Sequence, residues 1–186
     1  ARELSLEEIR EVSDECHSGK TSCEVEVFVH GALCMCYSGQ CQMSRMLGGA
    51  NGRSGNRGLC AQPCRLPYEN DRGEKGYFLS PKDICYIGSI GELCEAGVDS
   101  FKIEGRLKSP QYVAVVTSIY RKYMDMYAQT GRADVSDEDM NELLQIFNRG
   151  GFTQKYLRGN PKENILSGES PKNRDVFIGT VKAGQE

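Results

Sequence analysis

Apolar positions near the start of the chain recur at helical spacing. Ile9, Val12 and Cys16 are three and four residues apart, which places them on one face of a helix. Ser5 and Glu8 precede them in the S-x-x-E arrangement of a capping box, in which each side chain accepts a hydrogen bond from the other residue's backbone N–H. The pattern predicts a first helix that begins after Ser5.

Two segments alternate between polar and apolar residues, as a half-buried strand does. The first covers residues 24–29, where glutamates alternate with apolar side chains. The second covers residues 98–104 and places Phe101 and Ile103 on one face. Both are predicted to be strands.

Three further helices are predicted. Ser80 and Pro81 have the character of an N-cap followed by a first-turn proline, and the apolar spacing after them continues to Gly97. Ser109 and Pro110 begin a long helix in the same way, and residues 136–147 form a shorter one. The apolar stripe of the long helix is interpreted as core packing rather than as an aromatic surface for nucleic acid. It consists of Tyr112, Val116, Ile119, Tyr120, Tyr123 and Tyr127.

The alternation of helices and strands indicates α/β architecture, with βα units on a parallel sheet. Two strands cannot close a barrel, so the residues alone predict a partial α/β layer. Residues 161–172 have the composition of a linker, and residues 176–180 are predicted to be the first strand of a further domain.

Composition is that of a globular protein: 39% of the 186 residues are hydrophobic and 26% are charged. No apolar run approaches the roughly 20 residues that cross a bilayer. The chain opens on a charged stretch without Met, so we expect no signal peptide and a segment of a longer protein. With a net charge of −3, any contact with nucleic acid must be local.

The nine cysteines change this picture. An odd number without a secretory segment argues for a reducing cytoplasm, where clustered thiols usually serve metal or redox chemistry. Cys16 and Cys94 fall on helical apolar faces and are interpreted as small buried hydrophobes. Most of the others lie in or beside residues 31–76, a glycine-rich segment without periodicity. A loop of this length in a compact domain is usually functional.

Several thiolates in one place select zinc, copper(I) or an iron–sulfur cluster. The C-x2-C pairs of zinc ribbons do not occur in this sequence, which favours an iron–sulfur cluster and leaves zinc as the alternative. Free or oxidised thiols without a metal are the remaining interpretation. Cys23 and Cys36 are not favoured as ligands, and Cys36 would point away from its neighbours in an extended chain.

The sequence around these cysteines carries a longer pattern. Residues 26–34 read Glu-Val-Phe-Val-His-Gly-Ala-Leu-Cys, and residues 39–44 read Gly-Gln-Cys-Gln-Met-Ser. This closely resembles the signature of the peptidase U32 family, E-x-F-x-x-G-A-L-C followed after four residues by G-x-C-x-M-S. The similarity continues through residues 56–65, 80–85 and 101–108, and covers roughly residues 24–127.

The resemblance implies a TIM-barrel-like fold, of which this chain would carry a part. Residues 1–133 would form later βα units of the catalytic domain, with the Cys-rich loop at 31–76. Residues 134–160 would form a helical extension. Residues 161–186 would be a linker and the first strand of a small β-rich C-terminal domain.

The resemblance also implies chemistry. The family was first named for collagenase-like proteases. Other members of the family hydroxylate a base in ribosomal or transfer RNA, and some carry a [4Fe–4S] cluster on four cysteines. Carried over by position, the ligands would be Cys34, Cys41, Cys60 and Cys85, with Cys64 as the competing fourth. The implied partners are RNA or a protein substrate and the remainder of the parent barrel, and no membrane.

Candidate catalytic residues follow the two strands, at the rim where barrel enzymes gather their functional groups. His30 lies just past the first strand and Glu104 and Arg106 at the end of the second. The alternative for Glu104 and Arg106 is a structural ion pair with Lys102 or Lys108. His17, at a predicted helix end, is interpreted as structural.

Residues 31–76 also carry a local excess of arginine, which would suit RNA phosphates or simply keep an exposed loop solvated. The arginines are Arg45, Arg53, Arg57, Arg65 and Arg72. Tyr37 and Tyr68 are the aromatic candidates for stacking on a base.

Our leading hypothesis is an iron–sulfur-dependent enzyme that hydroxylates a base in ribosomal or transfer RNA. The second is a collagenase-like peptidase, although the chain has only two histidines and no H-E-x-x-H helix. The third is a non-catalytic metal-binding module. Since the absent early strands would supply part of the pocket, we do not expect the segment to be active alone.

Overall fold

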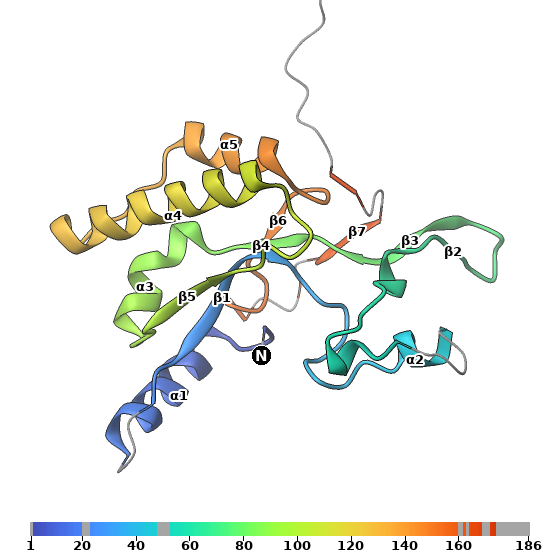
Figure 1. The fold of residues 1–186 in the computed structure, drawn as a ribbon, viewed down its shortest axis with the longest axis horizontal. Helices are drawn as coiled ribbons and strands as arrows, with labels where there is room; N and C mark the ends of the chain where they lie inside the picture. The colour runs from blue at the N-terminus through green and yellow to red at the C-terminus, as the bar shows by residue number, and fades with distance from the viewer. Residues whose placement is uncertain are drawn as a thin grey trace, which may run out of the picture.

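A four-stranded sheet in the order β5-β1-β4-β6 organises the chain (Figure 1). The computed structural model describes residues 2–19, 23–47, 53–159, 162, 164–168 and 172–173. Strand β1 (Glu26–Ala32) pairs in parallel with β5 (Ser100–Ile103) and antiparallel with β4 (Asp83–Cys85). Strand β6 (Phe152–Thr153) pairs in parallel with β4. Both predicted strands are confirmed, and the sheet around them is mixed.

The first helix, α1 (Leu6–Ser18), begins where its sequence predicts. The Ser5 backbone N–H donates to Glu8 Oε2 at 2.8 Å, and the Glu8 N–H donates to Ser5 Oγ, so the capping box is complete. The Leu6 N–H donates to the Leu157 carbonyl at 3.0 Å, and this bond joins the start of the helix to the segment near residue 157.

Three helices follow and pack with the sheet. The segment between β1 and β5 ends in the 3-10 turn η4 (Ile87–Ser89) and α3 (Ile90–Glu95), and β5 leads into α4 (Pro110–Thr130) and α5 (Asp137–Ile146). Ser109 caps α4, since its hydroxyl accepts from the Tyr112 N–H. In Figure 1, α4 and α5 lie above the sheet and α1 below it.

The core lies between α3, α4, α5 and the sheet. The α4 stripe is confirmed as core, with Tyr112, Val116, Ile119, Tyr120 and Tyr123 buried. They meet apolar side chains from β1, α3 and α5, namely Val29, Ile87, Ile90, Leu93 and Leu143. Burying each such side chain contributes about 1.5–3 kcal/mol, so this packing fixes the strands whose ends carry the site.

Residues 31–76 are more structured than the sequence suggests. They contain α2 (Met43–Leu47), the 3-10 turns η2 (Gly55–Arg57) and η3 (Pro63–Arg65), and strand β2 (Tyr68–Glu69). Strand β2 forms a hairpin with β3 (Lys75–Pro81), which also pairs with β7 (Leu166–Gly168). This second, three-stranded sheet anchors the cysteine-bearing segment.

The predicted helix start at Ser80 and Pro81 is wrong. Both residues end β3, where Pro81 lies opposite Leu166, and a short strand precedes the helix. The Ser80 hydroxyl does not cap a helix but accepts a hydrogen bond from Arg65 Nη1 at 2.8 Å. Tertiary pairing thus overrides the local cap signal. The end of the helix just before Gly97 is as predicted.

The α/β fold class is confirmed, and the described strands do not close a barrel. Residues 134–160 contain α5 and also β6, which is hydrogen-bonded into the main sheet. The strand predicted at residues 176–180 lies outside the described residues. None of the described helices is both long and apolar enough to span a bilayer.

Candidate metal centre and pocket

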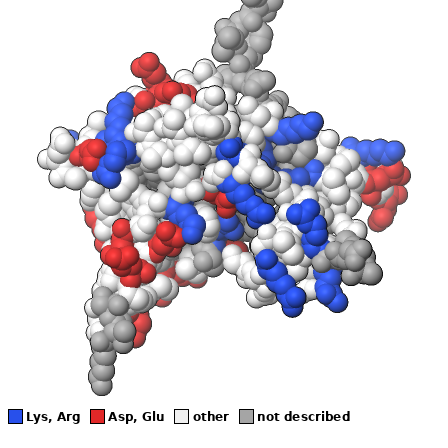
Figure 2. Space-filling model, in the orientation of Figure 1, with Lys and Arg blue, Asp and Glu red and all other residues white. Residues whose placement is uncertain are grey.

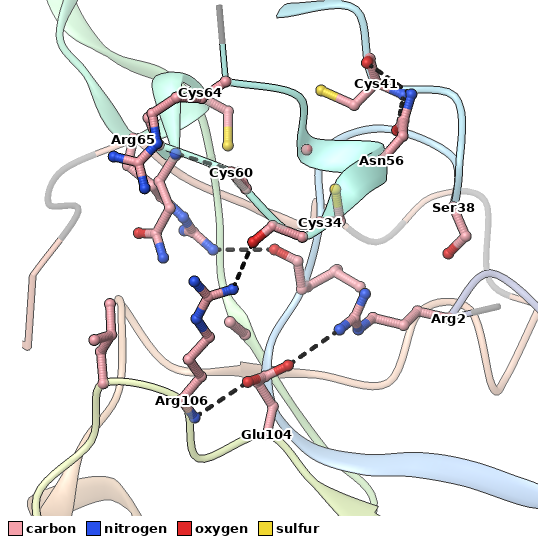
Figure 3. A pocket seen from close by; sticks show the side chains of 18 of the residues that line it. Arg2, Cys34, Ser38, Cys41, Asn56, Cys60, Cys64, Arg65, Glu104 and Arg106 are labelled. Atoms are coloured by element: carbon pink, nitrogen blue, oxygen red, sulfur yellow. Dashed lines mark hydrogen bonds and ion pairs between the residues drawn. The ribbon is translucent and has the colours of Figure 1, made fainter. Parts of the chain in front are cut away.

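A pocket of about 740 Å³ opens beside the carboxyl ends of the two parallel strands β1 and β5. Its walls come from residues 32–41 after β1, from residues 53–65, and from residues 104–108 after β5. Figure 3 shows thiols on one side of this space and the Glu104 and Arg106 side chains on the other. Strand ends of this kind are where α/β proteins commonly bind ligands.

Four cysteines that are distant in sequence line this pocket: Cys34, Cys41, Cys60 and Cys64. Burial raises the pKa of the Cys64 thiol, Arg65 lowers it, and the neighbouring thiols of Cys34, Cys60 and Cys41 raise it further. Mutual influence of this kind requires the sulfurs to be close in space. The convergence of distant thiols is therefore a property of the fold.

The Cys41 backbone is clamped by one amide side chain. The Cys41 N–H donates to Asn56 Oδ1 at 3.0 Å, and Asn56 Nδ2 donates back to the Cys41 carbonyl at 3.1 Å. A Cβ on Gly55 would lie 3.7 Å from the Cβ atoms of both Cys41 and Cys60. Gly55, the first residue of η2, therefore lies between the two cysteines and in contact with both. This holds the two thiols in fixed relation.

Backbone N–H groups donate to the sulfur at two of these positions. Burial raises the pKa of Cys41, but the N–H groups of Ser44 and Met43 at the start of α2 outweigh it and lower that pKa. At Cys60, the sulfur accepts from the Gln62 N–H at 3.2 Å. Gln62 has a φ of 55°, an uncommon conformation that points its N–H at this sulfur. Hydrogen bonds to the sulfurs are one of the means by which proteins tune iron–sulfur clusters.

The four cysteines line one pocket but do not form a site for a single metal ion. Among the described residues, no three His, Cys, Asp or Glu side chains form a group that could hold one metal ion. Zinc at about 2.3 Å from each sulfur would need sulfurs within about 4 Å of one another. A multi-iron cluster spans more distance between its ligands than one zinc ion does, and thiolates are the ligands of both.

Cys85 and Cys36 lie elsewhere than their sequence positions suggest. Cys85 is on β4, 2% exposed and outside the pocket lining, with its sulfur 3.9 Å from the Tyr120 hydroxyl. Burial raises its pKa to about 11. The chain bends at Cys36 instead of extending, and its thiol interacts with that of Cys41. The prediction that Cys36 points away from the other cysteines is wrong.

The cysteines predicted to be small buried hydrophobes are half-buried. Cys94 packs at the edge of the core, while Cys16 interacts with the exposed Cys23. His17 bonds Asp99 Oδ2 at 2.9 Å at the end of α1, in keeping with its structural interpretation.

His30 faces the core and not the pocket. It is 1% exposed and surrounded by the rings of Tyr112, Tyr120 and Phe152. Its Nδ1 lies 3.4 Å from the Tyr120 hydroxyl. Burial, with a smaller effect from Lys108, lowers the pKa of His30 to about 3, so the imidazole is neutral at physiological pH.

Glu104 and Arg106 do lie in the pocket wall. Glu104 Oε2 accepts from Arg2 Nη2 at 3.3 Å and Oε1 accepts from the Arg106 N–H at 3.2 Å. Arg106 reaches across to the Gly58 carbonyl at 2.9 Å, joining the β5 rim to η2. A Cβ on Gly31, whose φ is +112°, would lie 2.8 Å from the Glu104 carbonyl. The close backbone approach at this rim therefore depends on Gly31.

The pocket is strongly cationic. Its lining includes six Arg or Lys side chains and one carboxylate, Glu104; the cations are Arg2, Arg53, Arg65, Arg106, Lys108 and Arg149. Figure 2 shows Lys and Arg side chains gathered over the part of this face that carries η2 and η3, with acidic side chains toward α3 and α1. The chain therefore has a local positive surface although its net charge is negative.

The predicted basic loop divides into two sets. Arg45, Arg53 and Arg57 are exposed, whereas Arg65 is buried and donates to the Leu33 carbonyl at 3.1 Å and to the Pro81 carbonyl. Tyr37 is 69% exposed at the pocket rim, while Tyr68 is half-buried and donates to the Pro63 carbonyl.

Sequence reasoning missed Lys108 and Arg149 as pocket residues. From the sequence, Lys108 is predicted only as a possible ion-pair partner of Glu104. Arg149 follows α5, and no local pattern in the sequence connects it with residues 34–64; only the packing of β6 beside β4 brings it there.

The sequence profile of peptidase family U32 matches residues 1–167. The chain is 38% identical to a tRNA hydroxylation protein P1 of Bacillus subtilis, with 97% of this chain and 44% of that protein aligned. It is 38% identical to the 23S rRNA 5-hydroxycytidine C2501 synthase of Escherichia coli (97% and 28%) and 36% identical to a collagenase of Porphyromonas gingivalis (84% and 41%). No solved structure gave a significant match.

The fold and the site define a mixed α/β protein with a cysteine-lined, cation-rich pocket at its strand ends. The chain belongs to peptidase family U32. It spans less than half the length of each of these three relatives.

Proposed function

We propose that the chain is part of an iron–sulfur-dependent enzyme that hydroxylates a base in ribosomal or transfer RNA. The observation that carries this proposal is the convergence of four thiols on one cation-lined pocket. Two of the relatives are named for hydroxylation of tRNA or rRNA, which supports the choice of substrate.

Cys34, Cys41, Cys60 and Cys64 would hold a [4Fe–4S] cluster, because these are the cysteines that line the pocket. Cys85 is the competing fourth ligand; it would have to leave its contact with Tyr120 to reach the cluster. Zinc remains the alternative metal. When bound, the cluster would supply electron-transfer chemistry.

The pocket rim offers the features that an RNA strand needs. The exposed Tyr37 would stack on a base, and base–aromatic stacking typically contributes about 1–3 kcal/mol. Arg53 and Arg106, which line the same pocket, would contact phosphates of the strand. Their combination suits single-stranded RNA, whose bases can be splayed out.

Glu104 is assigned to proton transfer. Hydroxylation transfers an oxygen atom to the base from an oxygen donor that is reduced in the process, and the ring proton moves from carbon to the new oxygen. Glu104 is the one carboxylate among the described residues that line the pocket, and it would carry this proton. Its ion pair with Arg2 orients the carboxylate. We assign Arg106 to positioning, since its guanidinium holds the η2 segment through the Gly58 carbonyl.

The rest of the protein would complete the pocket. We propose that β1, α3, β5 and α4 are later βα units of a TIM-barrel-like domain and that the remainder of the barrel adds its early strands. Reduced thiols and an RNA substrate agree with a location in the cytoplasm.

A collagenase-like peptidase is the second candidate, supported by the name of the Porphyromonas relative. A Cys–His dyad would need an imidazole in the pocket, yet His30 is 1% exposed and His17 pairs with Asp99. The described residues therefore do not form a Cys–His dyad by themselves. A non-catalytic metal-binding module is the third candidate.

The test is a nucleoside analysis. Cells that lack the full-length protein and cells that express it are compared by mass spectrometry of digested tRNA and rRNA. We expect one hydroxylated nucleoside that depends on the protein and is lost with Glu104→Gln. Unchanged RNA, together with casein or collagen cleavage by the purified protein that persists after chelation of metals, would instead establish the peptidase.

A further inference from the structure

Three cationic side chains meet in one part of the pocket wall. Arg65 comes from η3, Lys108 from the β5–α4 connection and Arg149 from the segment after α5. Arg65 and Arg149 are only 8% and 7% exposed, and Lys108 is half-buried. They differ in this from the solvated arginines of the rim.

Each of the three is held in place by neighbouring groups. Arg65 donates to the Ser80 hydroxyl and to two backbone carbonyls. Arg149 Nη1 donates to Asp83 Oδ1 at 2.5 Å, and both Arg149 and Lys108 lie over the ring of Phe147. Such fixed donors bind a ligand without a large loss of side-chain entropy.

The cluster carries more positive than negative charge. Among the described residues, the buried carboxylate of Asp83 pairs with Arg149, and Asp83 lies outside the pocket lining. Glu104, the other acidic group facing Lys108, is already paired with Arg2. Within the described part of the chain, the Lys108 ammonium has no carboxylate within ion-pair distance. A desolvated charge without a counter-ion is costly, so this wall favours an anion.

The protonation of Lys108 reflects the same imbalance. Burial lowers its pKa to about 7, Arg149 and Arg65 lower it as well, and Asp83 and Glu104 raise it only in part. An anion placed beside the ammonium would restore the charged form.

We propose that Arg65, Lys108 and Arg149 form an oxyanion subsite of the pocket, which holds one phosphate or carboxylate group. A planar guanidinium and an ammonium are the side chains that proteins commonly use for this chemistry. The anion comes either from the backbone of the RNA substrate or from a separate small acid. The first source rests on the proposed function, while the subsite itself does not depend on the reaction.

The experiment follows Lys108 directly. Lysines of the full-length protein are ¹³C-dimethylated, Lys108 is assigned with a Lys108→Met variant, and its titration is recorded by NMR. Probes are inorganic phosphate, acetate and a short oligoribonucleotide. With phosphate or acetate, we expect the Lys108 pKa to rise by about 1–3 pH units. The exposed Lys75 is the control resonance and should not respond.

The charge-removing control is the double variant Asp83→Asn/Arg149→Met, which removes both partners of the buried ion pair together. It should weaken phosphate binding beside Lys108 at least about tenfold, which corresponds to the loss of one ionic hydrogen bond. In phosphate that half-saturates the wild type, the response of Lys108 should therefore fall at least about fivefold. A response to the oligoribonucleotide that competes with phosphate identifies RNA as the source; a response to phosphate and acetate alone identifies a small acid. No response to any probe, or an undiminished one in the double variant, overturns the subsite.

This result is separable from the proposed function. The NMR response requires neither iron nor hydroxylated RNA. A protein that binds phosphate here but modifies no RNA would retain the subsite and lose the hydroxylase assignment, whereas a hydroxylase whose Lys108 ignores every anion would retain its function and lose the subsite.

Discussion

The Asn56 side chain accepts a hydrogen bond from the Cys41 N–H at 3.0 Å and donates one to the Cys41 carbonyl at 3.1 Å. This clamp joins the segment before α2 to η2, across which Gly55 separates Cys41 from Cys60. Because the clamp consists of backbone contacts, it orients the thiol without competing for it. We regard it as the principal support of the proposed centre.

Asn56→Ala should therefore weaken cluster retention. Two hydrogen bonds of about 1 kcal/mol each are lost, so iron release to a chelator should accelerate by up to about thirtyfold. Release is followed by absorbance under anaerobic conditions. Asn70→Ala is the matched control, because Asn70 makes the same kind of side-chain bonds within the β2–β3 hairpin. Equal rates of iron release in the two variants would show that Asn56 does not support the proposed centre.

Gly31→Ala should destabilise the strand rim. A methyl group at this position meets the Glu104 carbonyl at 2.8 Å and the φ of +112° adds strain, for a combined cost of about 2–4 kcal/mol. Gly39 has a φ of +76°, but a Cβ added there would have no atom within 4 Å. Gly39→Ala should therefore lower the free energy of unfolding by only about 1–2 kcal/mol. Urea unfolding of the full-length variants measures both. A cost at Gly31 no larger than that at Gly39 would contradict the close approach.

His30 should contribute to acid unfolding. Its pKa is about 3 in the folded protein against 6.5 for an ordinary histidine, so below pH 6.5 the unfolded chain takes up a proton that the folded chain does not. Stability from this residue is complete above pH 6.5 and falls as the pH drops toward 3, by about 3–5 kcal/mol. His30→Gln should flatten the slope of unfolding free energy against pH in this window. Identical slopes would mean that His30 is protonated in the folded state.

Tyr37→Ala should weaken RNA binding. Loss of one stacked base costs about 1–3 kcal/mol, which is about a fivefold to hundredfold loss of affinity for a single-stranded oligoribonucleotide. Tyr37→Phe keeps the ring and should bind almost as the wild type does. Fluorescence anisotropy with the full-length protein compares them. Equal affinities for the Ala and Phe variants would exclude stacking at Tyr37.

Local signals in the sequence predicted local structure well. The Ser5–Glu8 capping box, the Ser109 cap and the α4 stripe depend on contacts within a few residues, and all are confirmed. Ser80 and Pro81 carried an equally good cap signal, but pairing of β3 with β7 used the same residues for a strand.

The candidate site was predictable only where cysteines marked it. Thiols are rare enough that their clustering in one segment is informative, and four of the five candidate ligands do line one pocket. Lys108 and Arg149 are common residue types without a motif, and they join the pocket through long-range packing. The burial of His30 likewise depends on rings that come from α4 and β6.

The central claim is that distant thiols hold one inorganic centre, and iron and sulfide analysis of anaerobically purified protein tests it most directly. We predict about four iron and four sulfide per chain, with loss of both in Cys→Ser variants at positions 34, 41, 60 and 64, and full content in Cys23→Ser and Cys85→Ser. Loss in Cys85→Ser together with full content in Cys64→Ser would make Cys85 the fourth ligand. Full-length wild-type protein that retains neither iron nor sulfide would contradict the account.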